Sequence, residues 1–190
     1  MKKKYYSVDV ESDGPAPGLY SMICFGVVEI DFDVLPDYSF QETFDLATYC
    51  PSTYHTLSPI SEKWDPESLS ISGFTREQHK TFEDPESSIK RFLIWMDHST
   101  EGATVRPIFI SDNNGYDWMF MCYYLWRFGG RNPFGFSSAN INSLYKGIQK
   151  DWFASFKRFR KTKHTHNPVD DAMGNAEAFV HIIKTSGIKL

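Results

Sequence analysis

The order of apolar patterns along the chain is the feature that most restricts its fold. Tyr5–Glu11 alternates between apolar and polar side chains, which predicts a half-buried strand. Ser21–Asp31 predicts a second, more buried strand, and Phe40–Leu46 alternates again as a third. Turn residues such as Asp13-Gly14 separate these runs by short distances. The first part of the chain is therefore predicted to form an antiparallel meander.

Helical patterns follow the strands. Asp84-Pro85 and Asn167-Pro168 each combine an N-cap residue with a proline at the first helical position, and apolar residues recur at helical spacing after both. Val105–Ser111 predicts a buried strand, and a helix is expected from about Tyr116 to Arg127. This order predicts an α/β fold with a mixed sheet covered by helices.

Length and composition favour one globular domain spanning residues 1–190. The 190 residues are 41% hydrophobic and contain no repeat or linker. Three cysteines without CxxC spacing predict a reduced, cytoplasmic protein without a structural zinc site. No apolar run approaches the roughly 20 residues of a membrane span, and no secretory signal follows the basic start, so neither membrane insertion nor export is expected.

The charge is distributed unevenly. The net charge is -4, yet the segment from Lys146 to Lys163 holds seven basic residues and one acid. Such a concentration indicates a local anion-binding surface, although a solvated helix face would have the same composition. Within this segment Trp152, Phe156 and Phe159 follow helical spacing, which predicts that they pack in the core.

Four acids and one histidine stand where a metal site could form. Asp9 and Glu11 are two residues apart on a predicted strand, so both leave one face about 7 Å apart and could hold a hard divalent cation. Asp117 follows a buried strand, where ligands collect in α/β sheets. Asp171 lies in the first turn of the last helix, and His166 on the preceding loop could act on a metal-bound water. Each residue alone also has an ordinary structural explanation.

The order of these residues is more specific than any one of them. Asp9-Val-Glu11, Asn113-Asn-Gly-Tyr-Asp117 and His166-Asn-Pro-Val-Asp-Asp171 together resemble the three motifs of the DEDDh branch of the DnaQ-like 3′-5′ exonuclease superfamily. The resemblance spans nearly the whole chain, and Ile71–Thr75 is similar to an Ile-x-Gly-Ile-Thr segment of many relatives. Two departures are Asp112, where the family usually has histidine, and Pro168, where it commonly has a small residue.

This resemblance implies an RNase H-like fold and a two-metal phosphodiester hydrolase. The implied ligands of two Mg²⁺ or Mn²⁺ ions are Asp9, Glu11, Asp117 and Asp171. His166 would be the general base. The expected reaction removes nucleoside 5′-monophosphates from the 3′ end of single-stranded nucleic acid. Similarity to stand-alone exoribonucleases of the oligoribonuclease and RNase T type favours RNA over DNA as the substrate.

Three further residues are candidates for substrate contacts by the same resemblance. Tyr116 would stack on an unpaired base, Met22 would wedge against one, and Ser12 follows the first motif. The resemblance also leaves a homodimer open, because many small relatives are dimers.

Several alternatives differ in class. His164-Thr-His166 could begin a zinc motif of metallo-β-lactamase-like hydrolases, but Pro168 and Val169 stand where that motif needs Asp and His. An RNase H-type endonuclease would ordinarily lack the His-x4-Asp pair. A 3′-5′ DNA exonuclease, or a nucleic-acid-binding domain without turnover, would share the fold.

Overall fold

The computed structural model describes residues 1–36, 45–101 and 104–190. The strands are β1 Lys2–Ser12, β2 Met22–Ile30, β3 Ser52–Thr56, β4 Val105–Ser111 and β5 Ser138–Asn140. The α-helices are α1 Pro66–Ile71, α2 Arg76–Lys80, α3 Pro85–Ser99, α4 Asn114–Gly129, α5 Ile141–Gln149 and α6 Pro168–Ser186. Two 3-10 turns are η1 Leu46–Thr48 and η2 Lys157–Phe159. None of the helices in these ranges has the length and apolar composition of a transmembrane span.

The strands form one mixed sheet in the order β3-β2-β1-β4-β5. The β1/β2 and β2/β3 pairs are antiparallel, whereas β1/β4 and β4/β5 are parallel. The predicted mixed sheet with an N-terminal meander is thus confirmed. Residues 40–44 of the predicted strand Phe40–Leu46 lie outside the described residues, Leu46 begins η1, and β3 supplies the third strand.

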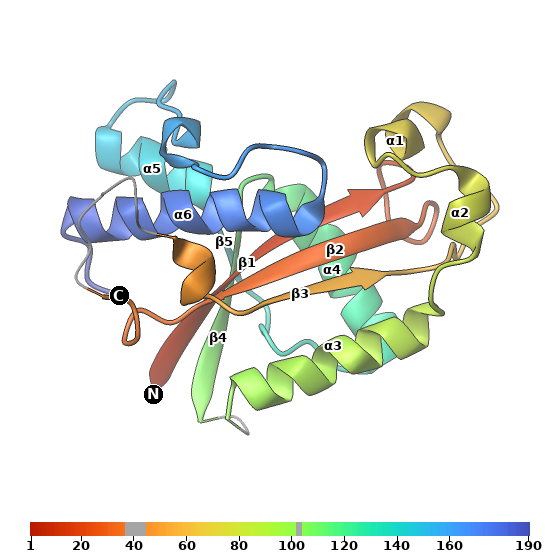
Figure 1. Cartoon of the computed structure of the whole chain (residues 1–190), viewed down its shortest axis with the longest axis horizontal. Helices are drawn as coiled ribbons and strands as arrows, with labels where there is room; N and C mark the ends of the chain where they lie inside the picture. Colours follow the sequence, from red (N-terminus) through yellow and green to blue (C-terminus); the bar gives the residue numbers. More distant parts are fainter. Residues whose placement is uncertain (37–44, 102–103) are drawn as a thin grey trace.

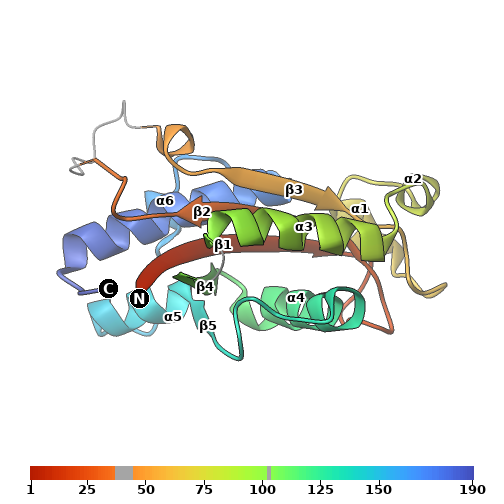
Figure 2. The ribbon, with the colours of Figure 1, turned by 90° about the horizontal axis from the view of Figure 1, so that it is seen from below.

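Helices cover both faces of the sheet. Alternation along β1 turns Tyr6, Val8 and Val10 towards a core shared with α3 and α4. Tyr5, on the other face of the strand, packs in a second core with α5 and α6. The two views place the sheet between these helix pairs (Figures 1 and 2).

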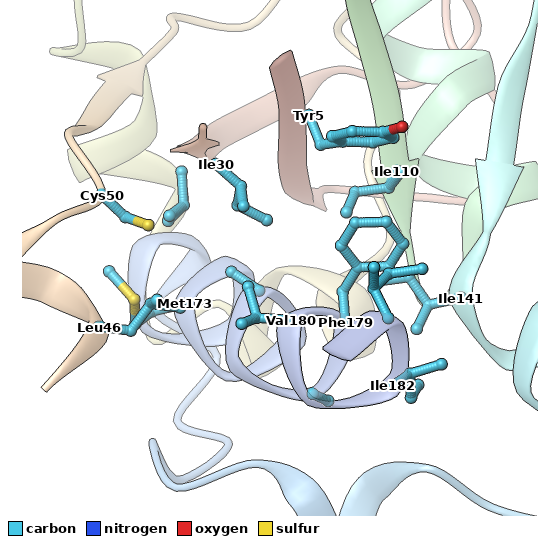
Figure 3. Close-up of a cluster of buried hydrophobic side chains, with 14 of the residues drawn as sticks. Tyr5, Ile30, Leu46, Cys50, Ile110, Ile141, Met173, Phe179, Val180 and Ile182 are labelled. Carbon is cyan, nitrogen blue, oxygen red and sulfur yellow. The ribbon is translucent and has the colours of Figure 1, made fainter. Parts of the chain in front are cut away.

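The second core fixes α6 against the strands. Tyr5, Ile30 and Ile110 extend from the sheet, and Phe179 and Val180 extend towards them from α6 (Figure 3). Each of these side chains is at most 7% exposed. Burying a residue of this kind contributes about 1.5–3 kcal/mol, so this contact holds α6 firmly in place.

The aromatic residues between η2 and α5 behave differently from one another. Phe156 is fully buried, as predicted, and Phe159 is half-buried. Trp152 is 78% exposed, so its predicted core position is wrong. The physical reason is that the left-handed Lys150, with φ 53°, ends α5, and the chain then follows turns and irregular structure as far as the three-residue η2. No continuous helix therefore aligns the three rings on one face.

Gly26 brings the start of α6 onto the sheet. A Cβ atom at Gly26 would lie 2.4 Å from the carbonyl carbon of Pro168 and 2.5 Å from the amide nitrogen of Val169. Gly26 also pairs directly with Asp9 in the β1/β2 register. The absence of a side chain therefore lets the first turn of α6 approach the strand pair beside Asp9.

We predict that Gly26→Ala lowers the free energy of unfolding by about 3 kcal/mol, because the added methyl group meets backbone that cannot rotate away. The matched control is Gly147→Ala in α5, where a Cβ meets nothing within 4 Å and a helical alanine is favoured. Urea denaturation of both variants measures the difference. Equal stability of the two variants would contradict this account of the contact.

Candidate active site

An acidic cavity lies between β1, α4 and α6. β4 runs parallel to β1 and ends at Ser111, beside the middle of β1, where Ser7 pairs with Ile110. The first turn of α4 follows β4, and the first turn of α6 packs across β2 and β1 (Figure 1). The cavity has a volume of about 180 Å³. Its lining comprises Asp9, Val10, Glu11, Asp112, Asn113, Tyr116, Asp117, Lys157, Arg160, His164 and Asn175.

The fold brings the predicted acids together. Asp9, Glu11 and Asp171 each place one carboxylate oxygen within 4.8 Å of the others. Asp117, which is 3% exposed, lines the same cavity as Asp9 and Glu11. Four carboxylates from β1, α4 and α6 therefore converge, although their positions are far apart in the sequence.

Burial and mutual repulsion make these carboxylates hard to ionise together. Burial, followed by the charges of Asp117, Glu11 and Asp171, raises the pKa of Asp9 well above its ordinary value. Burial and the charge of Asp171 raise the pKa of Glu11 to about 7. Burial raises the pKa of Asp117 to about 8, even though Ser111 and the Val10 amide hydrogen-bond to it. The cluster therefore needs additional positive charge to be fully ionised.

These residues fit a pair of hard divalent cations. The donor set is made of carboxylate oxygens at short mutual distances, which suits Mg²⁺ or Mn²⁺ better than softer metals. The raised pKa values of Glu11 and Asp117 show that the residues already present do not neutralise the ionised cluster. Bound cations would supply the missing charge.

Asp171 is held by several donors. Its Oδ1 atom lies 2.8 Å from Nη2 of Arg160 and 2.8 Å from Nδ1 of His164. The backbone amides of Thr165 and His166 donate to Oδ1 and Oδ2 at 3.2 and 3.0 Å. Asp171 is fully buried, so this set of donors fixes the orientation of its carboxylate.

His166 lies at the mouth of the site. Its Nδ1 atom is 3.6 Å from Oε1 of Glu11, and its side chain is 45% exposed. Its backbone has φ 60°, in the left-handed region that is costly for a non-glycine residue. Such a conformation persists only where surrounding contacts impose it. Here the contacts are the hydrogen bond from the His166 backbone amide to Asp171 and the helix cap at Asn167.

His164 stands beside His166 with a ring separation of 4.3 Å. These two histidines and Asp171 also place one potential ligand atom each within 4.8 Å of one another. Because Asp171 belongs to both groups, the histidines extend the acidic site and do not form a separate one.

The three predicted substrate contacts differ in their placement. Tyr116 lines the cavity, and its hydroxyl forms a 2.5 Å hydrogen bond with that of Ser12, which is itself buried. Met22 has no exposed surface and packs in the core with Phe25 and Phe120. The prediction that Met22 wedges against a base is therefore wrong for this structure, because its position next to a turn did not reveal that its side chain points inward.

Sequence reasoning placed Arg160 in the basic segment but did not predict its contact with Asp171. Its side chain is 10% exposed, and its Nε atom has no hydrogen-bond partner among the described residues. A Cβ at Gly174 would lie 2.4 Å from that Nε atom, so Gly174 makes room for the guanidinium group. The sequence shows only an arginine in a basic run and a glycine in a helix, and neither signals this contact.

Comparisons with known proteins support this interpretation. A 3′-5′ DNA exonuclease of Escherichia coli, Cap18, is 31% identical over 197 residues, which cover 97% of this chain and 94% of that protein. No protein-family model matches the chain.

Solved structures show the same fold at low sequence identity. The nuclease domain of 3′hExo, a DEDDh family member bound to rAMP, matches with a TM-score of 0.70 and 16% identity over 96% of this chain and 92% of that one. E. coli exonuclease I in complex with a dT13 oligonucleotide matches with a TM-score of 0.68 and 12% identity over 97% of this chain. The chain spans 41% of the length of exonuclease I.

The fold and the carboxylate cluster thus define a metal-dependent nuclease with an RNase H-like sheet. The chain belongs to the DEDDh family of 3′-5′ exonucleases in the DnaQ-like superfamily. It is a 3′-5′ exonuclease of this type, and enzymes of the family use two divalent metal ions.

We predict that the stability of the metal-free protein decreases as pH rises. Glu11 and Asp117 have folded-state pKa values of about 7 and about 8, above their ordinary values of 4.5 and 3.8. Between these limits the folded state binds more protons than the unfolded state, so stability is lost as the folded state is forced to ionise. Divalent ions bound to the ionised carboxylates should reverse this loss.

The measurement is the melting temperature in EDTA and in Mn²⁺ from about pH 5.5 to about pH 8.5. The stabilisation by Mn²⁺ should be larger at the higher pH, and Asp117→Asn should flatten the curve in EDTA. Parallel curves with and without Mn²⁺ would show that the carboxylates do not bind it.

We also predict that Gly174→Ala and Arg160→Gln act on the same contact. Each should destabilise the metal-free protein by about 3 kcal/mol, because each separates the buried carboxylate of Asp171 from its cation. The double variant should lose less than the sum of the single effects in a double-mutant cycle. The exposed Arg106→Gln is the control and should change stability by less than about 0.5 kcal/mol. If the stability losses of the two single variants simply add in the double variant, Gly174 and Arg160 do not act on the same contact.

Proposed function

We propose that the chain hydrolyses single-stranded DNA from the 3′ end and releases nucleoside 5′-monophosphates. The observation that carries the proposal is the convergence of four carboxylates: Asp9, Glu11 and Asp117 line one cavity, and Asp171 places an oxygen within 4.8 Å of those of Asp9 and Glu11. The His166 ring lies 3.6 Å from Glu11. The identity to a relative named as a DNA exonuclease, over nearly its full length, supports DNA in place of the RNA substrate expected from the sequence.

The carboxylates are the proposed ligands of both cations. Asp9 is close enough to Asp117, Glu11 and Asp171 for the charge of each to raise its pKa, and these four carboxylates would hold the two ions. Two bound divalent ions activate the attacking water and offset the charge that develops on the phosphate. Arg160 and His164 keep the Asp171 carboxylate oriented for this role.

His166 is the proposed general base. It accepts a proton from the water whose oxygen forms the new bond to phosphorus, and the bond from phosphorus to the 3′ oxygen of the preceding nucleotide breaks. The leaving oxygen takes up a proton and becomes the new 3′ hydroxyl. The exposed position of the His166 ring allows it to pass its proton to solvent after each turnover.

Tyr116 and Ser12 are proposed to bind the terminal nucleotide. The Tyr116 ring packs against Phe120 with 5.0 Å between centroids, and its hydroxyl is held by Ser12. A ring fixed at both ends provides a stacking surface at the cavity wall for an unpaired terminal base.

We predict that DNA and RNA oligonucleotides of the same sequence, labelled at the 5′ end, will be shortened at different rates. The DNA should give a ladder from its 3′ end in Mg²⁺ or Mn²⁺ and none in EDTA. His166→Ala should reduce turnover about 10²- to 10⁴-fold without loss of oligonucleotide binding. The control is His98→Ala, an exposed histidine on α3.

Each outcome tests one part of the proposal. Faster shortening of RNA than of DNA would support the exoribonuclease activity expected from the sequence. Internal cuts would indicate an endonuclease. Binding without turnover in either metal would indicate a nucleic-acid-binding domain. Near-normal rates in His166→Ala would remove it from the mechanism.

A further inference from the structure

We propose that Trp152 and Phe153 form a stacking platform for bases of the single strand upstream of the nucleotide being cleaved. These residues lie in the turn 150–154 between α5 and η2, which we call the aromatic tip. The proposal rests on the proposed function, because it extends the path of the strand beyond the acidic cavity.

The two rings are unusually accessible. Trp152 is 78% exposed and Phe153 is 91% exposed, and neither belongs to a hydrophobic core cluster of the described residues. Two adjacent aromatic side chains that are exposed to water add no buried apolar surface to the fold. Exposed apolar patches of this kind are typical of binding surfaces. Phe156, three residues further on, is fully buried and anchors the same segment.

The backbone of the aromatic tip is held by its own hydrogen bonds. Lys150 ends α5 in a left-handed conformation, and its amide donates to the carbonyl of Gly147. The Asp151 carboxylate accepts from the amide of Phe153 at 2.9 Å, and the Asp151 amide donates to Lys146 at 3.2 Å. Because the turn is already ordered, binding a base there costs little conformational entropy.

One lysine lies against the Trp152 ring, and further basic residues of the same segment indicate the occupant. The Lys146 ammonium lies 5.2 Å from the Trp152 ring centroid, and Lys150, Lys157 and Arg158 are exposed on the same segment. Flat aromatic faces next to cations match a polymer of stacked bases and phosphates. An apolar protein surface would not complement the charge of these residues.

The same segment reaches the acidic cavity. The Lys157 ammonium is 3.6 Å from the Asp112 carboxylate, and both residues line the cavity. The four consecutive Cα–Cα steps from Phe153 to Lys157 span at most about 14 Å. The connection then runs along α6 to its first turn, where Asp171 lies (Figure 1). A strand with its 3′ nucleotide in the cavity therefore needs only a few more nucleotides to meet the aromatic tip.

A second exposed aromatic surface serves as a comparison. Trp118, Met119 and Trp126 lie on the outer side of α4, and Trp126 is 50% exposed. Only one basic residue, Arg127, lines that groove among the described residues. It has accessible rings without the cluster of lysines, which makes Trp126 a matched control for the aromatic tip.

The test compares double variants of the aromatic tip in a binding assay. Fluorescence anisotropy in EDTA measures the affinity for a 5′-labelled single strand of about 20 nucleotides without hydrolysis. Replacing both rings by leucine, Trp152→Leu with Phe153→Leu, should weaken binding about 10- to 100-fold. Trp152→Tyr with Phe153→Tyr, which keeps aromatic faces, should remain within about 3-fold of the unaltered protein. Trp126→Leu should have no effect.

A dinucleotide separates this proposal from the proposed function, because it is too short to reach the aromatic tip. The leucine variant should hydrolyse the dinucleotide in Mn²⁺ at the unaltered rate. If the unaltered protein shortens neither the dinucleotide nor the long strand in Mn²⁺, but the leucine variant still binds the long strand weakly, the proposed function fails and the two rings remain a binding surface for single strands. Unchanged affinity of the leucine variant for the long strand overturns the platform. The same conclusion holds if the variant keeps this affinity but dissociates from a dimer into monomers, because the rings would then lie in a dimer interface.

Discussion

The close contact between the first turn of α6 and β2 is the constraint on which the rest of the site depends. Gly26 leaves space for the backbone of Pro168, and the hydroxyl of Ser7 donates to the carbonyl of Ala172 at 2.8 Å. Because Gly26 pairs with Asp9 in the sheet register, this contact places the helix beside the strand acids. The apolar side chains of α6 hold the helix, but the missing side chain at Gly26 sets how near it comes.

This arrangement gathers negative charge that the protein only partly offsets. The fully buried carboxylate of Asp171 forms an ion pair with Arg160, accepts hydrogen bonds from two backbone amides and lies at the positive end of α6. The pKa values of Asp9, Glu11 and Asp117 are raised. A helix N-terminus and one guanidinium cannot balance four carboxylates. The folded chain therefore stores an electrostatic cost that divalent ions relieve, which links the stability of the site to metal binding.

Local patterns predicted most of the fold, and tertiary contacts decided what they missed. Period-two alternation and Asx-Pro caps are local signals, so β1, β2, β4 and the starts of α3 and α6 were predicted well. The edge strand Ser52–Thr56 is short and polar, and it carries no such pattern. The order of the motifs predicted which acids could converge. The contact of Arg160 with Asp171 was missed because it depends on the packing of the Arg160 side chain against Gly174, which no spacing along the chain reveals.

The two departures from the family motifs have clear structural consequences. Pro168 occupies the first position of α6, needs no amide partner there, and presents its carbonyl group to Gly26. Asp112, in place of histidine, adds a negative charge that helps raise the pKa of Asp117. The same carboxylate pairs with Lys157 and so ties the basic segment to the wall of the cavity. A neutral imidazole could not hold that lysine by charge, which means that Asp112 and the cationic segment are best understood as one feature of this chain.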